Sequence, residues 1–340
     1  MNRLKIVFFI YSLLLFCACK KESHSLKVRL GYFPNITHAQ ALVGVSQNIF
    51  QKHLGQVLLE TKVFNAGPQA IEALFAGALD VVYVGPNPAI NAYVKSNGAF
   101  KIISGSCLGG ASLVVRNDAG IAGAGDFNGK RIATPQAGNT QDIAARIWLR
   151  NNRLKLREKG GTVHLLPIAN SDQLTLFLKK ELDAAWTVAP WTHRLIQEAN
   201  GKIFMKEENL WKDLTGGQYA TVVILASDQF VKAHPKIIKN LLQAHMETTD
   251  FLKSNSKEAK ELVNQELKKL TGKSLAPEVF ENSFKEIEFT LDPLKVSIQK
   301  QAQWSFQEGF LGKKEPELST LFDLSILNEC LKEKGKGLVN

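Results

Sequence analysis

The sequence predicts an α/β protein with two lobes, and three observations support this fold class. Strand-like and helix-like segments alternate through the first two-thirds of the 340 residues. Some strand segments, residues 80–84 among them, are almost continuously apolar, which is typical of parallel strands covered by helices on both faces. The order of segments also repeats once along the chain. A hydrophobic content of 45% is sufficient for two cores, because single domains usually contain about 100–200 residues.

The first series of segments is expected to form strand, helix, strand, helix and strand in turn. Residues 26–33 alternate apolar and polar side chains and stop at Pro34, as a strand does. The last strand of the series stops at Gly85. The expected elements are residues 26–33, 39–50, 57–64, 68–77 and 80–84.

The second series begins after a strand at residues 113–116 and follows the same order. Its expected elements are residues 129–134, 140–151, 162–168, 172–180 and 183–188. The two series end alike, since residues 76–82 and 179–185 each read as a helix end, a turn, an Asp and a strand. Two lobes of similar topology follow from this repeat.

A further apolar strand at residues 219–226 and a helical C-terminal region complete the chain. No linker separates the lobes, so we expect two strands to cross between them near Val114 and Val223. The C-terminal helices are expected to break at Pro277, Pro293 and Pro316. The expected domains are residues 26–115 and 225–340 for lobe 1, and residues 116–224 for lobe 2.

The N-terminus has the pattern of an export signal. Arg3 and Lys5 precede an apolar run at residues 6–16, which is too short for a membrane span of about 20 residues. Residues 1–18 are therefore expected to be a signal peptide, and the mature protein to act in the periplasm or at the cell surface.

A small residue directly before a cysteine also resembles the lipobox of bacterial lipoproteins. Ala18 precedes Cys19, whereas bulky Phe16 precedes Cys17. We therefore expect Cys19 to carry diacylglycerol and to anchor the protein to a membrane. Residues 19–25 are then a polar tether.

Charge and cysteine content exclude several other classes. The net charge is +10, but the lysines alternate with glutamates on helical segments and no nucleic-acid motif is present. A solvated surface beside an anionic membrane explains this charge. Cys107 and Cys330 lie far apart without metal-ligand spacing, so we expect free thiols and no metal, with a pairing of the two left open.

Small polar residues follow several of the expected strands. They occupy residues 34–38, 65–69, 85–88 and 136–141. The carboxyl ends of strands in such sheets form ligand sites, and the free N–H groups of adjoining helices favour anions. The same residue types also cap helices in any α/β protein, so each loop alone has a structural explanation.

Two side chains near this rim have alternative roles. His38 either contacts an anion when protonated or caps a helix. Trp186 either seals a core or forms the apolar wall of a pocket. No catalytic or cofactor motif is found in the sequence, so binding without turnover and without a cofactor is the simpler interpretation.

Five segments together resemble the solute-binding proteins of ABC importers in the nitrate/sulfonate/taurine group. They are residues 28–39, 64–74, 85–89, 133–142 and 323–328. The resemblance implies a two-lobed periplasmic-binding-protein-like fold (type II) with a hinge between the lobes. It also implies a monomer that closes over a small anion and delivers it to a membrane permease driven by a cytoplasmic ATPase.

The resemblance further implies a set of ligand-binding residues. They are Asn35, His38, Gly85, Asn87, Gly138, Asn139, Thr140 and Trp186. Relatives commonly have Glu-Pro-Trp where this chain has Ala189, Pro190 and Trp191. The missing carboxylate favours an amine-free sulfonate or nitrate over taurine.

Three alternatives remain open on sequence grounds. The same fold also binds heterocyclic thiamine precursors, and a lipid-anchored sensor of a ligand would have the same sequence features. A related enzyme family makes the thiamine pyrimidine, but an exported chain is unsuited to that role.

Overall fold

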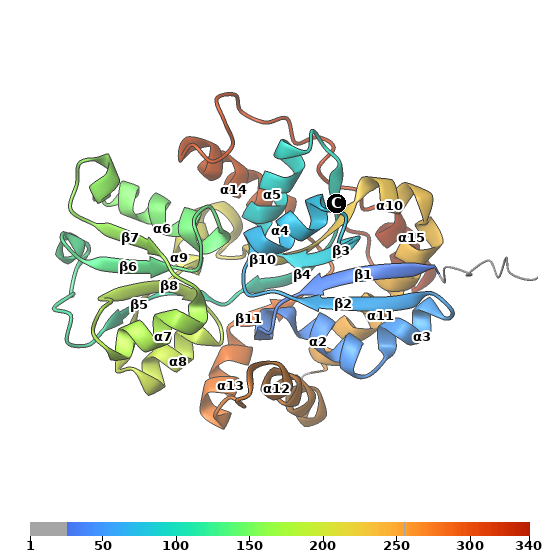
Figure 1. Ribbon diagram of the computed structural model, residues 1–340, viewed down its shortest axis with the longest axis horizontal. Helices are drawn as coiled ribbons and strands as arrows, with labels where there is room; N and C mark the ends of the chain where they lie inside the picture. Colours follow the sequence, from blue (N-terminus) through green and yellow to red (C-terminus); the bar gives the residue numbers. More distant parts are fainter. Residues whose placement is uncertain (1–25, 255) are drawn as a thin grey trace, which may run out of the picture.

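The computed structural model describes residues 26–254 and 256–340. The expected signal peptide, the lipidation site Cys19 and the tether lie outside the described residues. The described chain forms two lobes that lie side by side, each built on its own sheet (Figure 1). The prediction of an α/β protein with two lobes is confirmed.

Lobe 1 contains a six-stranded sheet in the order β11-β4-β10-β3-β1-β2. β1 pairs in parallel with β2 and β3, whereas β10 runs antiparallel between β3 and β4. The strands are β1 (Lys27–Tyr32), β2 (Leu58–Val63), β3 (Val81–Val84), β4 (Phe100–Gly109), β10 (Ala220–Ser227) and β11 (Ile287–Phe289).

Helices cover both faces of this sheet because its central strands are apolar on both sides. Side chains of a strand alternate between faces. Val81 and Tyr83 of β3 accordingly pack with α2, α3 and α11, while Val82 and Val84 pack with α4, α5 and α14. The lobe 1 helices are α2 (Ala39–Ser46), α3 (Ile49–Leu54), α4 (Gly67–Phe75), α5 (Pro86–Lys95), α10 (Asp228–Ala233), α11 (Pro235–Lys253), α12 (Lys257–Thr271), α13 (Pro277–Lys285), α14 (Lys295–Gln307) and α15 (Ser325–Glu333).

Lobe 2 contains a five-stranded sheet in the order β7-β6-β8-β5-β9. Its strands are β5 (Ala111–Arg116), β6 (Arg131–Thr134), β7 (His164–Pro167), β8 (Ala184–Val188) and β9 (Gly201–Lys206). Its helices are α6 (Thr140–Asn151), α7 (Asn170–Leu178), α8 (Trp191–Glu198) and α9 (Glu208–Thr215).

The chain passes between the lobes at two pairs of glycines. Gly109 and Gly110 separate β4 from β5, and Gly216 and Gly217 lie between α9 and β10. All four have positive φ angles, from 66° to 96°, which glycine adopts without steric cost. The crossings therefore lie before the expected positions, because β5 pairs along its length with lobe 2 strands and β10 with lobe 1 strands.

Local structure differs from the expectation in two further places. The helix expected at residues 39–50 is two helices, α2 and α3, separated at Asn48, whose φ is 55°. The loop expected at residues 85–88 is the start of α5, because Pro86 suits the first position of a helix. Neither α5 nor β4 nor β9 was expected from the sequence.

Two further findings concern the described residues. None of their helices combines the length and the apolar character that a membrane crossing requires. Cys107 and Cys330 are both buried free thiols.

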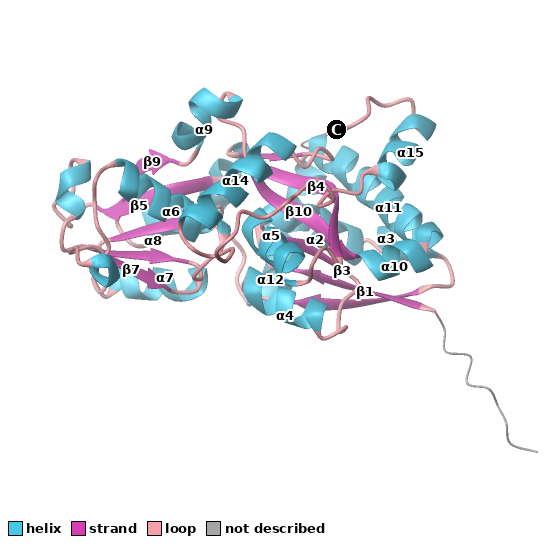
Figure 2. Ribbon diagram, turned by 90° about the horizontal axis from the view of Figure 1, so that it is seen from above, coloured by secondary structure: helices cyan, strands magenta, loops and turns pink. Residues whose placement is uncertain are grey.

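The lobes also contact each other through α14 (Figure 2), which lies against α6. Trp304 of α14 packs on Trp211 of α9 with ring centroids 4.6 Å apart. Just beyond α14, the Glu308 carboxylate pairs with Arg150 at 3.2 Å and with Lys159 at 2.8 Å. Apolar and ionic contacts thus join lobe 1 to lobe 2 along this edge.

Candidate ligand-binding site

A cavity of about 430 Å³ lies between the two lobes. Residues that follow β1, β2 and β3 line it from lobe 1, and residues that follow β6, β7 and β8 line it from lobe 2. The carboxyl ends of parallel strands meet at one edge of a sheet, so these loops converge. The end of α12 completes the wall.

On the lobe 1 side, the short helix at Ile36–His38 brings polar groups to the cavity. Asn35 caps this helix, since its Oδ1 accepts a hydrogen bond from the N–H of Thr37 at 3.3 Å. Asn35, Thr37 and His38 all line the cavity. These three residues therefore bring hydrogen-bond donors and acceptors to the lobe 1 wall, and Asn35 also caps the short helix.

His38 is one of the residues expected at the ligand. Burial lowers its pKa to about 3, which favours the neutral ring and gives no support to the protonated contact. The backbone N–H of Phe33 lies 3.4 Å from Nδ1 and donates to it, which assigns the ring proton to Nε2. The neutral ring therefore still offers one N–H donor.

On the lobe 2 side, the start of α6 provides Asn139 and Thr140. Asn139 Oδ1 caps the helix by accepting from the N–H of Gln141 at 2.9 Å. Thr140 is 4% exposed, and its hydroxyl has no hydrogen-bond partner among the described residues. A Cβ atom on Gly85 would lie 2.6 Å from Thr140 Oγ1. Only glycine therefore fits where the lobes approach here.

Five helices begin at the cavity: α4, α5, α6, α7 and α8. Only α6 among them has a side-chain cap. At the other four starts the cap residues are Ala66, Gly85, Ala169 and Pro190, and none makes a side-chain cap hydrogen bond. Uncapped first-turn N–H groups remain at these starts, except at Pro68 of α4 and at Pro86 and Pro88 of α5, which have no N–H. The positive ends of the helix dipoles favour an anion.

Two cationic side chains line the cavity, Arg194 of α8 and Lys273 just after α12. No Asp or Glu of the described residues lines it. Sequence analysis missed both cations, because neither follows an expected strand. A signal was present, since Trp191, Arg194 and Glu198 are spaced three and four residues apart and so share one helix face.

Asn87 and Gly138 were expected to line the cavity, but neither does. Asn87 lies on α5 and faces α14, where its Nδ2 donates to Ser305 Oγ at 2.6 Å. The N–H of Gly138 donates to Asp142 at 2.9 Å. Gly138 is needed for another reason, because its φ is 72° and a Cβ atom would lie 2.9 Å from the Phe310 ring.

Trp186 lies in the core of lobe 2 and not at the cavity. Its side chain is fully buried, and its indole Nε1 donates to Glu207 at 2.7 Å. Of the two alternatives drawn from the sequence, the core role is the one observed. Trp191, three residues after the end of β8, lines the cavity instead.

The arrangement of loops and helix starts around the cavity can bind a ligand. Among the described residues, no three His, Cys, Asp or Glu side chains are placed to hold a metal ion. Two lobes, a cavity between them and helix starts on both walls define the fold of a two-lobed binding protein.

Residues 21–267 match the model of the NMT1-like family, and the chain belongs to this family. A protein of Brucella abortus (strain 2308), named as a binding protein, is 24% identical over 264 residues. That similarity covers 75% of this chain and 78% of the relative. The family assignment is consistent with a binding role for the cavity.

Solved structures of solute-binding proteins share the fold. The alkanesulfonate-binding protein SsuA of Xanthomonas axonopodis pv. citri, bound to MOPS, superposes with a TM-score of 0.70 at 19% identity, covering 84% of this chain and 94% of that one. The nitrate-binding protein NrtA of Synechocystis PCC 6803 gives 0.71 at 14% identity, with 91% and 89% covered. The resemblance inferred from sequence is confirmed at the level of family and fold.

Proposed function

We propose that this protein is the extracytoplasmic solute-binding component of an ABC importer. It captures a small organic anion and delivers it to a membrane permease that is driven by a cytoplasmic ATPase. The structures of similar fold include the ligand-binding component of an ABC-type import system from Staphylococcus aureus, with a TM-score of 0.71 at 14% identity, covering 90% of this chain and 99% of that one. The binding role named for this structure and for SsuA and NrtA supports the proposal.

One observation carries the choice of an anion. The cavity has two cationic side chains and five helix starts, while none of the described carboxylates lines it. An anion gains from every one of these groups, whereas an ammonium group would be buried without a counter-charge. This favours an amine-free sulfonate or a similar oxyanion over taurine. A heterocyclic thiamine precursor is the alternative ligand, and a sensor is the alternative role.

Ligand binding is expected to close the two lobes. Polar groups lie on both walls, so a ligand makes its full set of contacts only in the closed form. The glycine pairs at residues 109–110 and 216–217 provide backbone freedom for the movement. A smaller radius of gyration on ligand addition, measured by X-ray scattering, would support this; an unchanged radius at saturation would contradict it.

The membrane anchor remains a prediction from the sequence. Replacing Cys19 by Ser should move the protein from the membrane fraction to the soluble fraction. Mass spectrometry of the mature N-terminus provides the direct test, because a lipid still attached to the Cys19→Ser protein would contradict the assignment.

Thr140 provides the sharpest test of anion binding. Valine has the shape of threonine without the hydroxyl, so Thr140→Val should weaken sulfonate binding about tenfold, or 1.4 kcal/mol, in calorimetry. Thr192→Val is the matched control, because Thr192 is also buried with an unpartnered hydroxyl but does not line the cavity. Binding of a neutral heterocycle alone, unaffected by Thr140→Val, would overturn the anion assignment.

A further inference from the structure

We propose that Arg194 and Lys273 form a charge clamp across the cleft for a second acidic group of the ligand. The preferred ligand is then a dianionic organic acid, with one oxyanion at the helix starts and a carboxylate or similar group at the clamp. This inference rests on the proposed function and specifies the ligand class of that same site.

Arg194 is held in one orientation by two neighbours. Its Nε and Nη2 donate to the two carboxylate oxygens of Glu198 at 2.7 and 2.9 Å. Its guanidinium also lies 4.8 Å from the centroid of the Trp191 ring. The side chain is 15% exposed, and no described residue accepts a hydrogen bond from Nη1. A guanidinium fixed in this way loses little entropy when it binds a further oxyanion.

Lys273 reaches the same cavity from the opposite lobe. It follows the C-terminal end of α12, where Gly272 adopts a φ of 77°. The free carbonyl groups at a helix C-terminus disfavour an anion, and the ammonium of Lys273 offsets them. Arg194 and Lys273 both line the cavity, so each lobe contributes one cationic side chain to it. Hydrogen bonds from Arg194, and in part the charge of Lys273, lower the pKa of Glu198, which agrees with this placement.

Cavity size indicates a ligand that extends beyond a single small ion. A water molecule occupies about 30 Å³ in the liquid, so the 430 Å³ cavity has room for roughly ten or more groups of that size. Nitrate would leave most of this space to water. Nitrate carries one charged group, whereas the cavity offers two kinds of anion contact, the clamp and the unpartnered Thr140 hydroxyl at the start of α6. A ligand with acidic groups at both ends would use both.

Paired ligands test the clamp directly. Calorimetry would compare propane-1-sulfonate with 3-sulfopropanoate, which ends in a carboxylate. We expect the dianion to bind the wild-type protein at least tenfold more tightly. Arg194→Gln and Lys273→Gln should each remove most of this preference, because each weakens binding of the dianion far more than binding of propane-1-sulfonate. Lys268→Gln is the control, because Lys268 lies in the last turn of α12 but not at the cavity.

The outcomes separate this inference from the proposed function. Equal affinities of the two sulfonates for the wild-type protein would overturn the clamp, as would a full preference in Arg194→Gln, and the anion site would stand. Failure of both sulfonates to bind, with binding of a neutral heterocycle, would overturn the proposed function itself. Arg194→Lys keeps the charge with fewer donors and should retain part of the preference, which guards against a loss caused by misfolding.

Discussion

Each lobe contains the same polar contact, here called the corner, in which an Arg at or near the start of β1 or β6 binds an Asp directly before β3 or β8. In lobe 1 the backbone N–H and Nε of Arg29 donate to Asp80 at 2.8 and 2.9 Å. In lobe 2 the same two groups of Arg131 donate to Asp183 at 2.9 and 3.2 Å. Each guanidinium also donates to a carbonyl of the turn before the Asp, that of Gly77 or Lys180.

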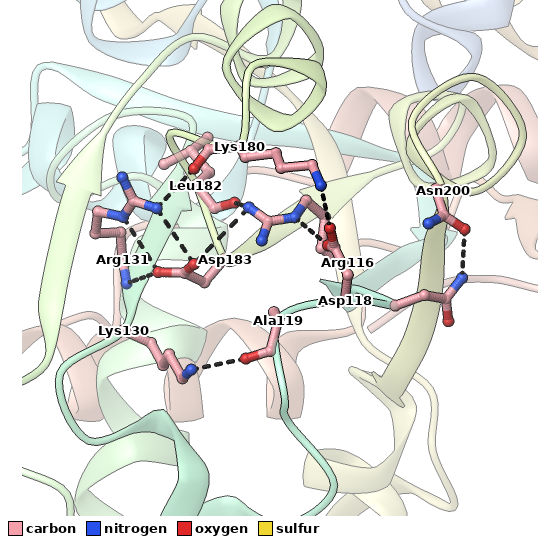
Figure 3. A network of polar contacts seen from close by, with 10 residues as sticks. Arg116, Asp118, Ala119, Lys130, Arg131, Lys180, Leu182, Asp183 and Asn200 are labelled. Atoms are coloured by element: carbon pink, nitrogen blue, oxygen red, sulfur yellow. Dashed lines mark hydrogen bonds and ion pairs between the residues drawn. The ribbon is translucent and has the colours of Figure 1, made fainter.

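The two corners differ in their surroundings. Asp183 also faces Arg116, and Arg116 and Lys180 both face Asp118 (Figure 3). Arg116 Nη1 lies 3.8 Å from the Asp183 carboxylate, and the Asp118 carboxylate lies 2.6 Å from Arg116 Nε and 2.6 Å from Lys180 Nζ. The carboxylate of Asp80, in contrast, accepts hydrogen bonds from Arg29 alone among the described residues. The Arg–Asp corner is thus isolated in lobe 1, whereas in lobe 2 it is part of a network of charged side chains. The repeat conserves the corner, while the network is particular to lobe 2.

Replacing Asp80 or Asp183 should change the free energy of unfolding more than any other substitution in the two corners. Breaking a buried ion pair by deleting one partner costs about 3–5 kcal/mol, and the partial exposure of Arg29 (31%) and Arg131 (40%) reduces this cost. We expect about 3 kcal/mol for Asp183→Ala, which leaves buried Arg116 with less compensation, and about 2 kcal/mol for Asp80→Ala. Urea unfolding followed by circular dichroism measures both. A larger loss for Asp80→Ala would show that the network adds nothing.

Buried titratable groups give the lobes opposite pH dependences. Burial lowers the pKa of His245 in lobe 1 to about 4, and its ring lies between Tyr83 Oη at 2.9 Å and the carbonyl of Gly105 at 3.0 Å. Burial raises the pKa of Glu207 in lobe 2 to about 7, although two indoles donate to it. The contribution of His245 is present above pH 6.5 and lost as the pH falls towards 4. That of Glu207 is present below pH 4.5 and lost as the pH rises through 7.

Single substitutions should separate the effects of His245 and Glu207 on how the unfolding free energy changes with pH. The shifts correspond to about 3 kcal/mol for each group. Glu207→Gln should leave a protein whose unfolding free energy falls with acid between pH 6.5 and 4.5, and His245→Gln one whose unfolding free energy falls as the pH rises over the same window. Denaturant titrations at several pH values provide the measurement. Slopes of the same sign in the two variants would contradict the assignment.

The turn before each Asp provides a smaller test. Gly77 has a φ of 65° and open space around its missing Cβ, so Gly77→Ala should cost about 1 kcal/mol through backbone strain alone. Gly125→Ala is the control, because that position is equally open without a positive φ. Thermal unfolding of both variants decides the matter, and equal melting temperatures would argue against strain at Gly77.

Lys180 occupies the equivalent turn in lobe 2 with a φ of 61°. Lys180→Gly should stabilise the protein by about 0.5 kcal/mol, because relief of the left-handed backbone exceeds the contribution of an exposed ion pair. It should also raise the pKa of Asp118, which Lys180 and Arg116 hold at about 2. NMR titration of that carboxyl provides a second readout. If the Lys180→Gly variant is destabilised instead, the ion pair between Lys180 and Asp118 contributes more to stability than the relief of backbone strain.

The sequence predicted the local half of each corner but not its Arg, which lies 51 residues before Asp80 and 52 before Asp183. The matched segments at residues 76–82 and 179–185 carry the helix end, the turn and the Asp within a few residues. The order of the strands was beyond reach, because β10 enters lobe 1 between β3 and β4 from a distant part of the chain. The start of α5 was missed because its Pro-Asn-Pro run resembles a loop.

The site was predicted in part for similar reasons. Asn35, His38, Gly85, Asn139 and Thr140 follow strands directly and line the cavity. Trp186 lies on the face of β8 that packs into the core of lobe 2. Every residue of β8 is buried, so the sequence has no alternation of polar and apolar residues that would distinguish its two faces. Arg194 and Lys273 reach the cavity from a helix turn and a helix end, so only the three-dimensional arrangement brings them there.

The indole arrangement around Glu207 gives this protein an internal optical reporter. Trp186 and Trp211 both donate to that carboxylate, and Trp211 also contacts Trp304 of the other lobe. Trp191 lines the cavity itself. Indole emission depends on nearby charge and on packing, so a rotation of the lobes would change the fluorescence of the unlabelled protein. Stopped-flow mixing could then time the movement without any attached dye.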